Sequence, residues 1–271
     1  MLRNGFEHKK RIVVKVGTST LTHEGGRANF KLIDRLCRVL SDINNMGREV
    51  ILVTSGAIGV GMGRLKLASR PSATADRQAI AAVGQCELMQ IYSKTFSEYG
   101  QIVGQILMTR DVVDYESSRN NVVNTFETLL RMGIIPIVNE NDSVATEELE
   151  NDHNRLFGDN DKLSVIVASL TRADLLIMLS DRDGFYIEDP RNNPDAEMIR
   201  LVTEITPRIE RAAGGSGSSR GTGGMATKLD AAKTALSMGI DMVLANGAVP
   251  DALYDILEGA DVGTYFHAIK K

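Results

Sequence analysis

RIVVKVGTST, residues 11–20, is a short apolar stretch that gives way to small polar residues at Gly17. Its first six residues are rich in β-branched side chains, which predicts a buried strand that ends at the glycine. Similar runs recur at EVILVT (49–54), QIVGQILMT (101–109), IIPIVN (134–139), ADLLIMLS (173–180) and MVLAN (242–246). Stretches with helical spacing separate them, at 30–47, 74–96, 117–132, 161–171, 203–212 and 226–238. This alternation predicts an α/β protein with a mainly parallel central sheet that is covered on both faces.

The composition of the 271-residue chain narrows the functional classes. A hydrophobic fraction of 43% and a net charge of −4 fit a globular protein without the basic excess of a nucleic-acid binder. Cys37 and Cys86 form no close-spaced pair, which argues against a disulfide framework or a zinc site and fits a reducing cytoplasm. The longest apolar run, 163–179, is interrupted by Arg172 and Asp174, so we expect a cytoplasmic protein without a membrane span.

Small polar clusters follow most of the predicted strands. The clusters are Gly17–Ser19, Ser55–Ala57, Asn139–Asp142, Ser180–Asp181 and Asn246–Gly247. Ligands of an open parallel sheet bind beyond the carboxyl ends of its strands. Any one cluster could be an ordinary polar loop, but together they predict a ligand site along one edge of the sheet. No change of composition marks a linker, so residues 1–271 are expected to form a single domain.

A glycine-rich loop, GGSGSSRGTGGMATK at 214–228, ends in a lysine at the start of a predicted helix. Glycines let main-chain N–H groups approach an anion closely, and a helix N-terminus adds partial positive charge. Lys228 adds a full charge at the same place. A flexible linker would have a similar composition, but this loop lies inside the α/β pattern. A second lysine–glycine element, KVGTST at 15–20, indicates phosphoryl transfer rather than binding alone.

Two other nucleotide-binding patterns do not fit. The run GAIGVGMG at 56–63 follows a predicted strand, as a dinucleotide-binding fingerprint does. Its spacing differs from G-x-G-x-x-G, and no acidic residue ends a following strand at the expected distance, so a nicotinamide enzyme is not expected. The Walker pattern G-x-x-x-x-G-K-[ST] is absent from the sequence as well.

Two polar stretches concentrate aspartate and asparagine: VNENDSVAT at 138–146 and FGDNDKLS at 157–164. Such residues are common in turns and at helix N-caps, and Asp161 opens a predicted helix. Beside a phosphate site they could instead bind an ammonium group, a metal ion or the two lysines. We favour a functional interpretation, although no residue is assigned as a metal ligand.

Six motifs occur in a fixed order: KVGTST (15–20), VTSGAIGVG (53–61), VNENDSVAT (138–146), GDNDKLS (158–164), LSDRDGFY (179–186) and GTGGMATK (221–228). Together they closely resemble the glutamate 5-kinase branch of the amino acid kinase family, over essentially the whole chain. The VNEND and GTGGMATK elements are the most specific. The resemblance implies a three-layer αβα sandwich. It also implies ATP-dependent phosphorylation of the L-glutamate side-chain carboxylate, the first step of proline biosynthesis.

The resemblance also implies a role for individual residues. Lys15 and Lys228 should contact the transferring phosphoryl group, and Asp161 should orient both lysines as the third catalytic residue. Substrate binding is implied for Ser55, Gly56, Asn139, Asp142, Asp159 and Asn160. ATP binding, with Mg²⁺, is implied for Lys15, Gly17, Ser180, Asp181, Thr222, Gly223, Gly224, Met225, Ala226, Thr227 and Lys228. The N-terminal part of the domain should therefore bind glutamate and the C-terminal part ATP.

Further properties follow from the same resemblance. Feedback inhibition by L-proline, a homo-oligomer and a functional link to a glutamyl phosphate reductase are implied. Many relatives append a PUA domain, and this chain is expected to lack one. Acetylglutamate kinase or aspartate kinase would share the lysines and glycines, but the VNEND element argues against both. A non-catalytic amino-acid sensor with the same fold is the other alternative, and the presence of Lys15, Asp161 and Lys228 argues against it.

Overall fold

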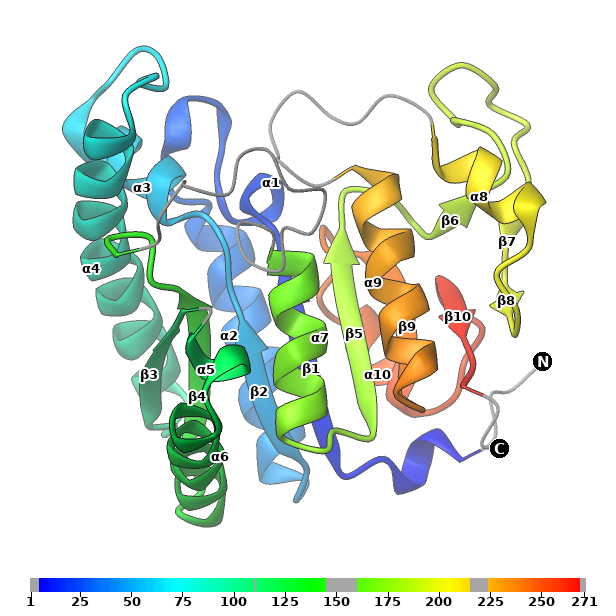
Figure 1. The fold of residues 1–271 in the computed structure, drawn as a ribbon, viewed down its shortest axis with the longest axis horizontal. Coiled ribbons are helices and arrows are strands. Elements are labelled where there is room, and N and C mark those ends of the chain that lie inside the picture. Colours follow the sequence, from blue (N-terminus) through cyan, green and yellow to red (C-terminus); the bar gives the residue numbers. More distant parts are fainter. Residues whose placement is uncertain (1–4, 110, 145–159, 215–223, 269–271) are drawn as a thin grey trace.

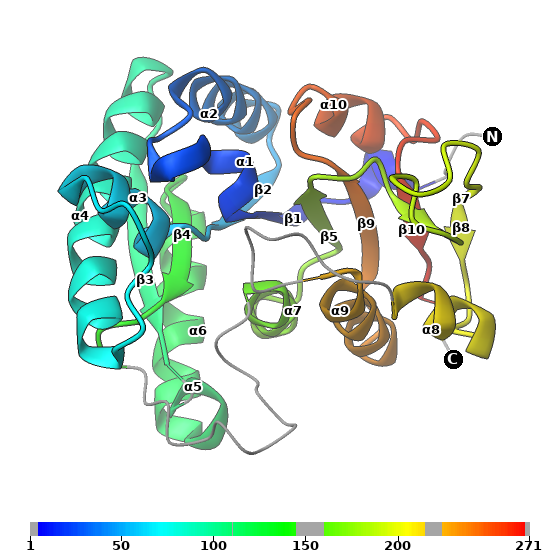
Figure 2. The same ribbon diagram turned by 90° about the horizontal axis from the view of Figure 1, so that it is seen from above.

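The computed structural model describes residues 5–109, 111–144, 160–214 and 224–268. Its centre is a sheet with the described strand order β3-β4-β2-β1-β5-β9-β10-β8, enclosed between two layers of helices (Figure 1 and Figure 2). The strands from β3 to β9 in this order are parallel to one another. Strand β10 is antiparallel to β9, and β8 is parallel to β10. The predicted α/β sandwich with a mainly parallel sheet is therefore confirmed.

Most elements lie where the sequence pattern placed them. The strands of the sheet are β1 (Arg11–Val16), β2 (Glu49–Val53), β3 (Val103–Met108), β4 (Ile135–Glu140), β5 (Leu175–Ser180), β8 (Leu201–Val202), β9 (Asp241–Asn246) and β10 (Thr264–Phe266). The predicted helices correspond to α2 (Phe30–Asn45), α4 (Thr74–Glu98), α6 (Glu116–Arg131), α7 (Asn160–Leu170), α8 (Pro207–Ala213) and α9 (Met225–Ser237).

Shorter elements complete the described chain. They are α1 (Thr18–Leu21), α3 (Ala57–Leu65), α5 (Asp111–Asp114), α10 (Ala252–Leu257), the 3₁₀ turns Phe6–His8 and Glu24–Gly26, and the strands β6 (Phe185–Tyr186) and β7 (Met198–Ile199). Strands β6 and β7 pair antiparallel and form a small separate sheet. The short helices α1, α3, α5 and α10, like the sheet strands β8 and β10, were not predicted.

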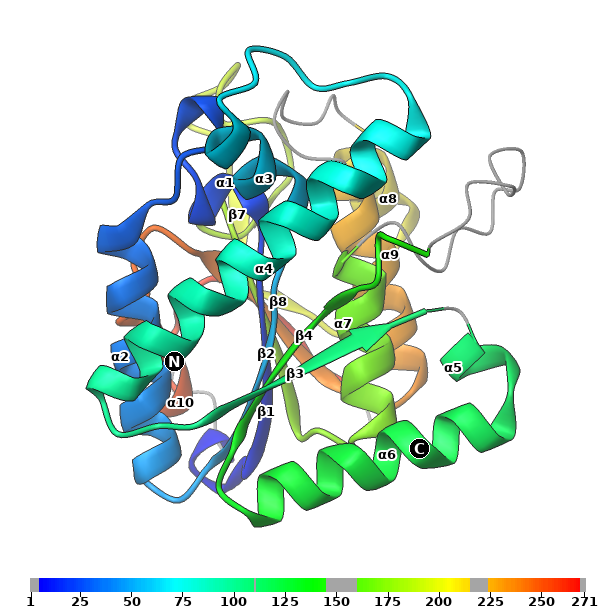
Figure 3. The same cartoon turned by 90° about the vertical axis from the view of Figure 1, so that its left-hand side faces the viewer.

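The core consists of two apolar layers, one on each face of the sheet. Alternate residues of β1 enter different layers: Ile12 and Val14 pack with α2, α4 and α10, whereas Val13 packs with α6, α7 and α9. Since both faces are covered, the strands are almost continuously apolar, as buried parallel strands are. Figure 3 shows the β3 edge of the sheet, with α4 and α6 on its opposite sides.

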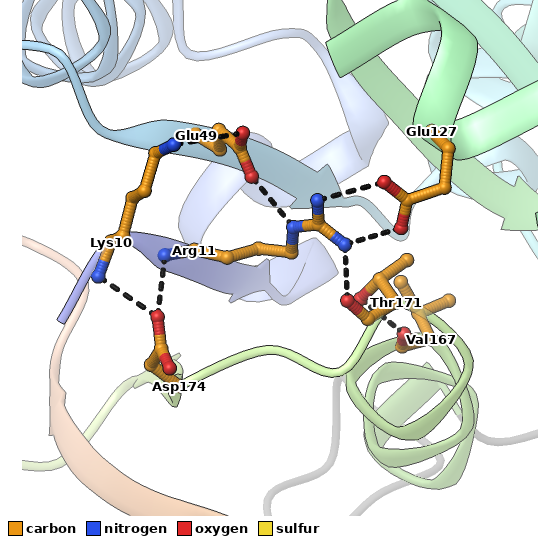
Figure 4. A network of polar contacts seen from close by, with 7 residues as sticks. All are labelled: Lys10, Arg11, Glu49, Glu127, Val167, Thr171 and Asp174. Atoms are coloured by element: carbon orange, nitrogen blue, oxygen red, sulfur yellow. Dashed lines mark hydrogen bonds and ion pairs between the residues drawn. The ribbon is translucent and has the colours of Figure 1, made fainter. Parts of the chain in front are cut away.

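A network of ion pairs joins the amino ends of the strands, opposite the expected ligand edge (Figure 4). The guanidinium of Arg11 donates to Glu49 at 2.7 Å, to both carboxylate oxygens of Glu127 at 2.5 and 3.0 Å, and to the carbonyl of Thr171. The backbone N–H groups of Lys10 and Arg11 donate to Asp174 at 2.9 and 2.8 Å. This network ties β1 to β2, to α6 and to the turn between α7 and β5.

Helices α3 and α4 pack backbone against backbone through glycines. A Cβ atom on Gly84 would lie 1.7 Å from the carbonyl oxygen of Ala57, and one on Gly61 would lie 2.1 Å from that of Ile80. Both distances are far below van der Waals contact, so only glycine fits at these positions. The glycine run at 56–63 is therefore a helix-packing motif. This agrees with its departure from the G-x-G-x-x-G spacing of dinucleotide-binding proteins.

Replacing Gly84 with alanine is expected to lower the free energy of unfolding by about 1–3 kcal/mol, the usual cost of overpacking. The added methyl group would push α4 away from the first turn of α3. Urea denaturation of the purified variant measures this loss. Ser93→Ala, at an exposed position of the same helix, is the matched control and should change stability by less than about 0.5 kcal/mol. Equal stability of Gly84→Ala and wild type would contradict the backbone contact.

Candidate active site

The carboxyl ends of the parallel strands lie along one edge of the sheet, seen from above in Figure 2. Strand β1 lies near the middle of the sheet: the chain first builds β2, β3 and β4 on one side of it, and then β5 and β9 on the other. Such a reversal of strand order creates a crevice at the carboxyl ends. Helices α7 and α9 pack side by side on one face of the sheet, and both begin near this edge (Figure 1).

Asp161 contacts two lysines that are far apart in the sequence. Lys15 Nζ lies 2.5 Å from Asp161 Oδ1, and Lys228 Nζ lies 3.2 Å from Asp161 Oδ2. The hydroxyl of Thr227 donates to the same Oδ2 atom at 3.1 Å. The exposed fractions are only 6% for Lys15, 1% for Asp161 and 8% for Lys228. The structure thus brings the three predicted catalytic residues into one buried cluster.

The secondary structure explains how each member reaches this cluster. Because side chains alternate along a strand, Lys15 lies on the same face of β1 as Val13, which packs against α7 and α9. Asp161 lies in the first turn of α7, where a carboxylate is favoured by the helix dipole. Lys228 lies in the first turn of α9, where the dipole disfavours a cation. Asp161 supplies the compensating negative charge.

The electrostatics of the cluster favour an anionic ligand. Burial alone would raise the pKa of Asp161, but attraction by Lys15 and Lys228 outweighs burial and lowers the pKa to about 2. Asp161 is therefore ionised at neutral pH. With both lysines protonated, the cluster carries one net positive charge in a poorly solvated place, where charge interactions are stronger than in water.

A second group of predicted residues lies at the ends of β2 and β4. Asn160 Nδ2 donates to Ser55 Oγ at 2.9 Å. Asn139, which is only 2% exposed, donates from Nδ2 to Gln85 Oε1 at 2.8 Å. Strands β2 and β4 are paired, and the N–H of Thr54 donates to the carbonyl of Val138 at 2.9 Å, so Ser55 and Asn139 follow neighbouring strands. Their side chains contact different helices, Ser55 the start of α7 and Asn139 α4. Gln85, on α4, was not predicted as a site residue.

Two local features hold Ser55 in place. The hydroxyl groups of Thr54 and Tyr92 share a buried hydrogen bond of 2.9 Å, which fixes the end of β2 against α4. Gly56 then adopts a φ of 96°, a left-handed conformation that favours glycine, and α3 starts at the next residue. Asp142 follows β4 and is half-buried, and burial raises its pKa although Arg70 partly offsets the effect.

The predicted nucleotide residues lie around the ends of β5 and β9 and the start of α9. The hydroxyl of Ser180 donates to Asp181 Oδ1 at 3.1 Å, and the N–H of Gly247 donates to the Ser180 carbonyl at 2.7 Å. Gly224 is the N-cap of α9, which contains Met225, Ala226, Thr227 and Lys228. Gly17 directly follows β1, and a Cβ there would lie 3.7 Å from Lys15 Nζ. Three predicted site residues, Asp159, Thr222 and Gly223, lie outside the described residues.

Two further properties concern the described part of the chain. It contains no group of three or more His, Cys, Asp or Glu side chains placed to hold a metal ion. None of its helices combines the length and the apolar character needed to cross a membrane.

Comparisons with known proteins place this geometry in context. Residues 10–246 match the model of the Amino acid kinase family. Glutamate 5-kinase from Clostridium perfringens (strain 13 / Type A) is 60% identical, with 99% of this chain and 99% of that protein covered. Glutamate 5-kinase from Listeria innocua is 56% identical, with 100% and 97% covered.

Solved structures also match. UMP kinase from Bacillus anthracis superposes with a TM-score of 0.65 at 17% identity, covering 97% of each chain. An isopentenyl phosphate kinase from T. acidophilum superposes with a TM-score of 0.64 at 18% identity, covering 95% of this chain and all of that one. At such identities these two likenesses concern the fold alone.

Proposed function

Since the chain belongs to the amino acid kinase family, we propose that it transfers the γ-phosphoryl group of ATP to the side-chain carboxylate of L-glutamate. The product is L-glutamyl 5-phosphate, made in the first step of proline biosynthesis. Relatives that carry the name glutamate 5-kinase, at 56–60% identity over nearly their whole length, support this activity. The structural observation that carries it is the buried cluster of Lys15, Asp161 and Lys228, beside the polar group around Ser55.

The chemistry needs charge neutralisation more than proton transfer. A glutamate side chain has an ordinary pKa of about 4.3, so the attacking carboxylate is already ionised at neutral pH and needs no general base. One of its oxygens forms a bond to the γ-phosphorus, while the bond from that phosphorus to the bridging oxygen breaks and leaves its electron pair on ADP. An anion must therefore approach a polyanion, and catalysis depends on alignment and electrostatic stabilisation.

The two lysines meet this requirement. We propose that Lys15 and Lys228 offset the charge on the γ-phosphate and on the departing ADP. Asp161 would hold both ammonium groups at fixed positions before the substrates arrive, so that little reorganisation is needed during the reaction. We propose that main-chain N–H groups near Gly17 and Gly56, which follow β1 and β2, donate to phosphoryl oxygens.

The substrates would occupy the two sides of this cluster. We propose that Ser55, Gly56, Asn139, Asp142 and Asn160 bind glutamate, with Asp142 facing its α-ammonium group. An ammonium partner would return the raised pKa of Asp142 toward its ordinary value, which favours binding of a free amino acid over an N-acetylated one.

ATP would lie on the other side of the cluster. We propose that Gly17, Ser180, Asp181 and residues 224–228 bind it. Mg²⁺ would neutralise phosphate charge, and we assign it no ligands among the described residues because Asp161 is already paired with two lysines. Coordination mainly by phosphate oxygens and water is the usual arrangement for this ion in kinases.

Asp142→Ala is expected to raise the KM for L-glutamate by about 10-fold or more, because the α-ammonium group loses its charged partner. The KM for ATP should stay within about twofold of wild type, since the nucleotide does not reach β4 in this arrangement. Steady-state kinetics with each substrate varied in turn measure both values. Asp195→Ala, at an exposed aspartate, is the control that should leave both unchanged. A rise confined to the KM for ATP would reverse the assignment of Asp142.

The activity itself is tested by ADP release from purified protein with ATP and Mg²⁺. L-glutamate, N-acetylglutamate and L-aspartate are compared as acceptors, each with and without L-proline. Turnover with L-glutamate alone is expected, with inhibition by L-proline. Turnover with another acceptor would keep the phosphate site but overturn the assignment of Asp142 and Asn160. Folded protein that binds ATP but turns over no acceptor would favour an amino-acid sensor.

A further inference from the structure

Gln85 and Asn139 form a pair of side-chain amides beside the proposed glutamate site. The pair shares a hydrogen bond of 2.8 Å from Asn139 Nδ2 to Gln85 Oε1. From this pair we infer that Gln85 is a specificity-determining residue that donates a hydrogen bond to the α-carboxylate of the amino-acid substrate. This inference rests on the proposed function and adds to it a recognition group for the end of glutamate that does not react.

Unpaired polar atoms of this amide pair and of Asn160, all at the carboxyl ends of the strands, indicate a site for a polar ligand. Gln85 Nε2, Asn139 Oδ1 and Asn160 Oδ1 are each buried without a hydrogen-bond partner in the part of the chain that the structure describes. Buried polar atoms in folded proteins almost always have a partner. If Gln85 only anchored Asn139, this role would explain the hydrogen bond to Gln85 Oε1. It would not explain why Gln85 Nε2 is buried without a partner.

These atoms lie at the carboxyl ends of two neighbouring strands, β2 and β4. Gln85 bonds to Asn139 on the α4 side of the sheet, and Ser55 accepts from Asn160 on the α7 side. The position of Gln85 is set by the residue before it, because Gly84 brings α4 into backbone contact with the first turn of α3. Gln85 is thereby held in the middle of α4, beside the first turn of α3, which follows the Ser55–Gly56 loop.

The chemistry of the unpaired atoms matches an amino acid. One amide nitrogen and two amide oxygens offer a donor and two acceptors, and an α-amino acid offers a carboxylate acceptor and an ammonium donor. The two amide oxygens and Asp142 can accept hydrogen bonds from the ammonium group. The nitrogen of Gln85 can then donate to the α-carboxylate.

The position in the sheet separates this end of the substrate from the reacting end. Strand β4 is two strands away from β1, which carries Lys15. Neighbouring strands are about 4.8 Å apart, so β4 lies roughly 10 Å from the lysine strand. The amide pair lies on the α4 side of the sheet, whereas Lys15 lies on the α7 side. In this proposal the glutamate lies across the carboxyl end of β2, with its side-chain carboxylate toward the lysines and its α-carbon groups toward β4.

The test exchanges hydrogen-bond donor and acceptor both on residue 85 of the protein and on the amino-acid substrate. Gln85→Glu keeps an oxygen for Asn139 but replaces the donating nitrogen with an acceptor. L-isoglutamine keeps the reacting side-chain carboxylate and replaces the α-carboxylate of glutamate with an amide donor. In Gln85→Glu, the KM for L-glutamate should rise about 10-fold or more, and kcat/KM for L-isoglutamine should exceed that of wild type. The KM for ATP should stay within about twofold.

Control variants separate recognition from a structural effect. Gln85→Met, which has no polar group, should raise the KM for L-glutamate without improving L-isoglutamine. Gln90→Glu, at an exposed position of the same helix, should behave as wild type with both acceptors. Thermal unfolding of each variant reports on folding.

The outcomes distinguish this inference from the proposed function. An unchanged KM for L-glutamate in Gln85→Glu overturns the inference, and so does a higher KM with no gain for L-isoglutamine. Either result leaves the glutamate kinase activity of wild type standing. Failure of wild type with L-glutamate would instead overturn the proposed function.

Discussion

Asp161→Asn is expected to lower kcat by about 100-fold or more, the usual cost of losing a preorganised electrostatic contact in an active site. The substitution keeps the shape of the side chain but removes the charge that holds Lys15 at 2.5 Å and Lys228 at 3.2 Å. Without it, two buried ammonium groups repel each other, and neither is held where charge develops on the phosphoryl group. Single-turnover kinetics at saturating substrates isolate this loss from changes in binding.

The same variant tests the linkage between charge and stability. Because the lysines lower the pKa of Asp161 to about 2 in the folded protein, its charge stabilises the fold above the unfolded pKa of about 3.9. That stabilisation is lost as the pH falls through about 2. Removing the shared partner of two buried cations should cost about 3 kcal/mol at neutral pH, and the difference from wild type should shrink below about pH 4.

Chemical denaturation at several pH values between neutral and about pH 3 measures this difference. Asp230→Asn, at an exposed aspartate in α9, is the matched control for both kinetics and stability. A constant difference in stability down to the lowest pH would show that the charge of Asp161 does not stabilise the native state. An unchanged kcat would remove Asp161 from the catalytic cluster.

Lys228→Ala is expected to lower kcat by about 100-fold or more while leaving the KM for L-glutamate nearly unchanged. Its ammonium group is proposed to neutralise charge that increases during transfer, so its loss affects the transition state more than the bound substrates. Asp161 would keep Lys15 as its remaining ion-pair partner, which limits the structural damage. The substitution also introduces alanine, the residue with the highest helix propensity, in the first turn of α9.

Steady-state kinetics of Lys228→Ala are compared with those of Lys233→Ala, which alters a more exposed lysine of the same helix. The control should retain the kcat of wild type, apart from the small effect of losing its ion pair with Glu210. A large loss of ATP affinity at normal kcat would indicate that Lys228 binds the ground state only.

Strands that are buried on both faces could be read from the sequence because their apolar runs are continuous. This holds for β1 and β5, which pair parallel to each other in the middle of the sheet. Strand β10 has only three residues, and its structure depends on pairing with β9 and β8 rather than on its own pattern. Helix α3 was missed because its glycines resemble a loop until the contact with α4 is known.

The candidate site was predictable to a similar degree. Lys228 follows a glycine-rich loop at a helix start, and Lys15 precedes a strand-end glycine, so both had a local signal. That Asp161 lies between them depends on the packing of three separate elements, and it came from family resemblance. Gln85 has no local signal, because a glutamine in an amphipathic helix resembles a solvated surface residue until its partner Asn139 is placed.

The contacts of Arg11 have a consequence for the order in which the chain can fold. Its partners at positions 49, 127 and 171 are separated from it by 38, 116 and 160 residues. Contacts between residues so distant in sequence close large loops, and they form slowly. On the ribosome, β1 emerges long before β5, its neighbour on one side. One edge of β1 therefore stays unpaired until about two-thirds of the chain has been synthesised. An unpaired strand edge can aggregate, and a chaperone would protect it during this period.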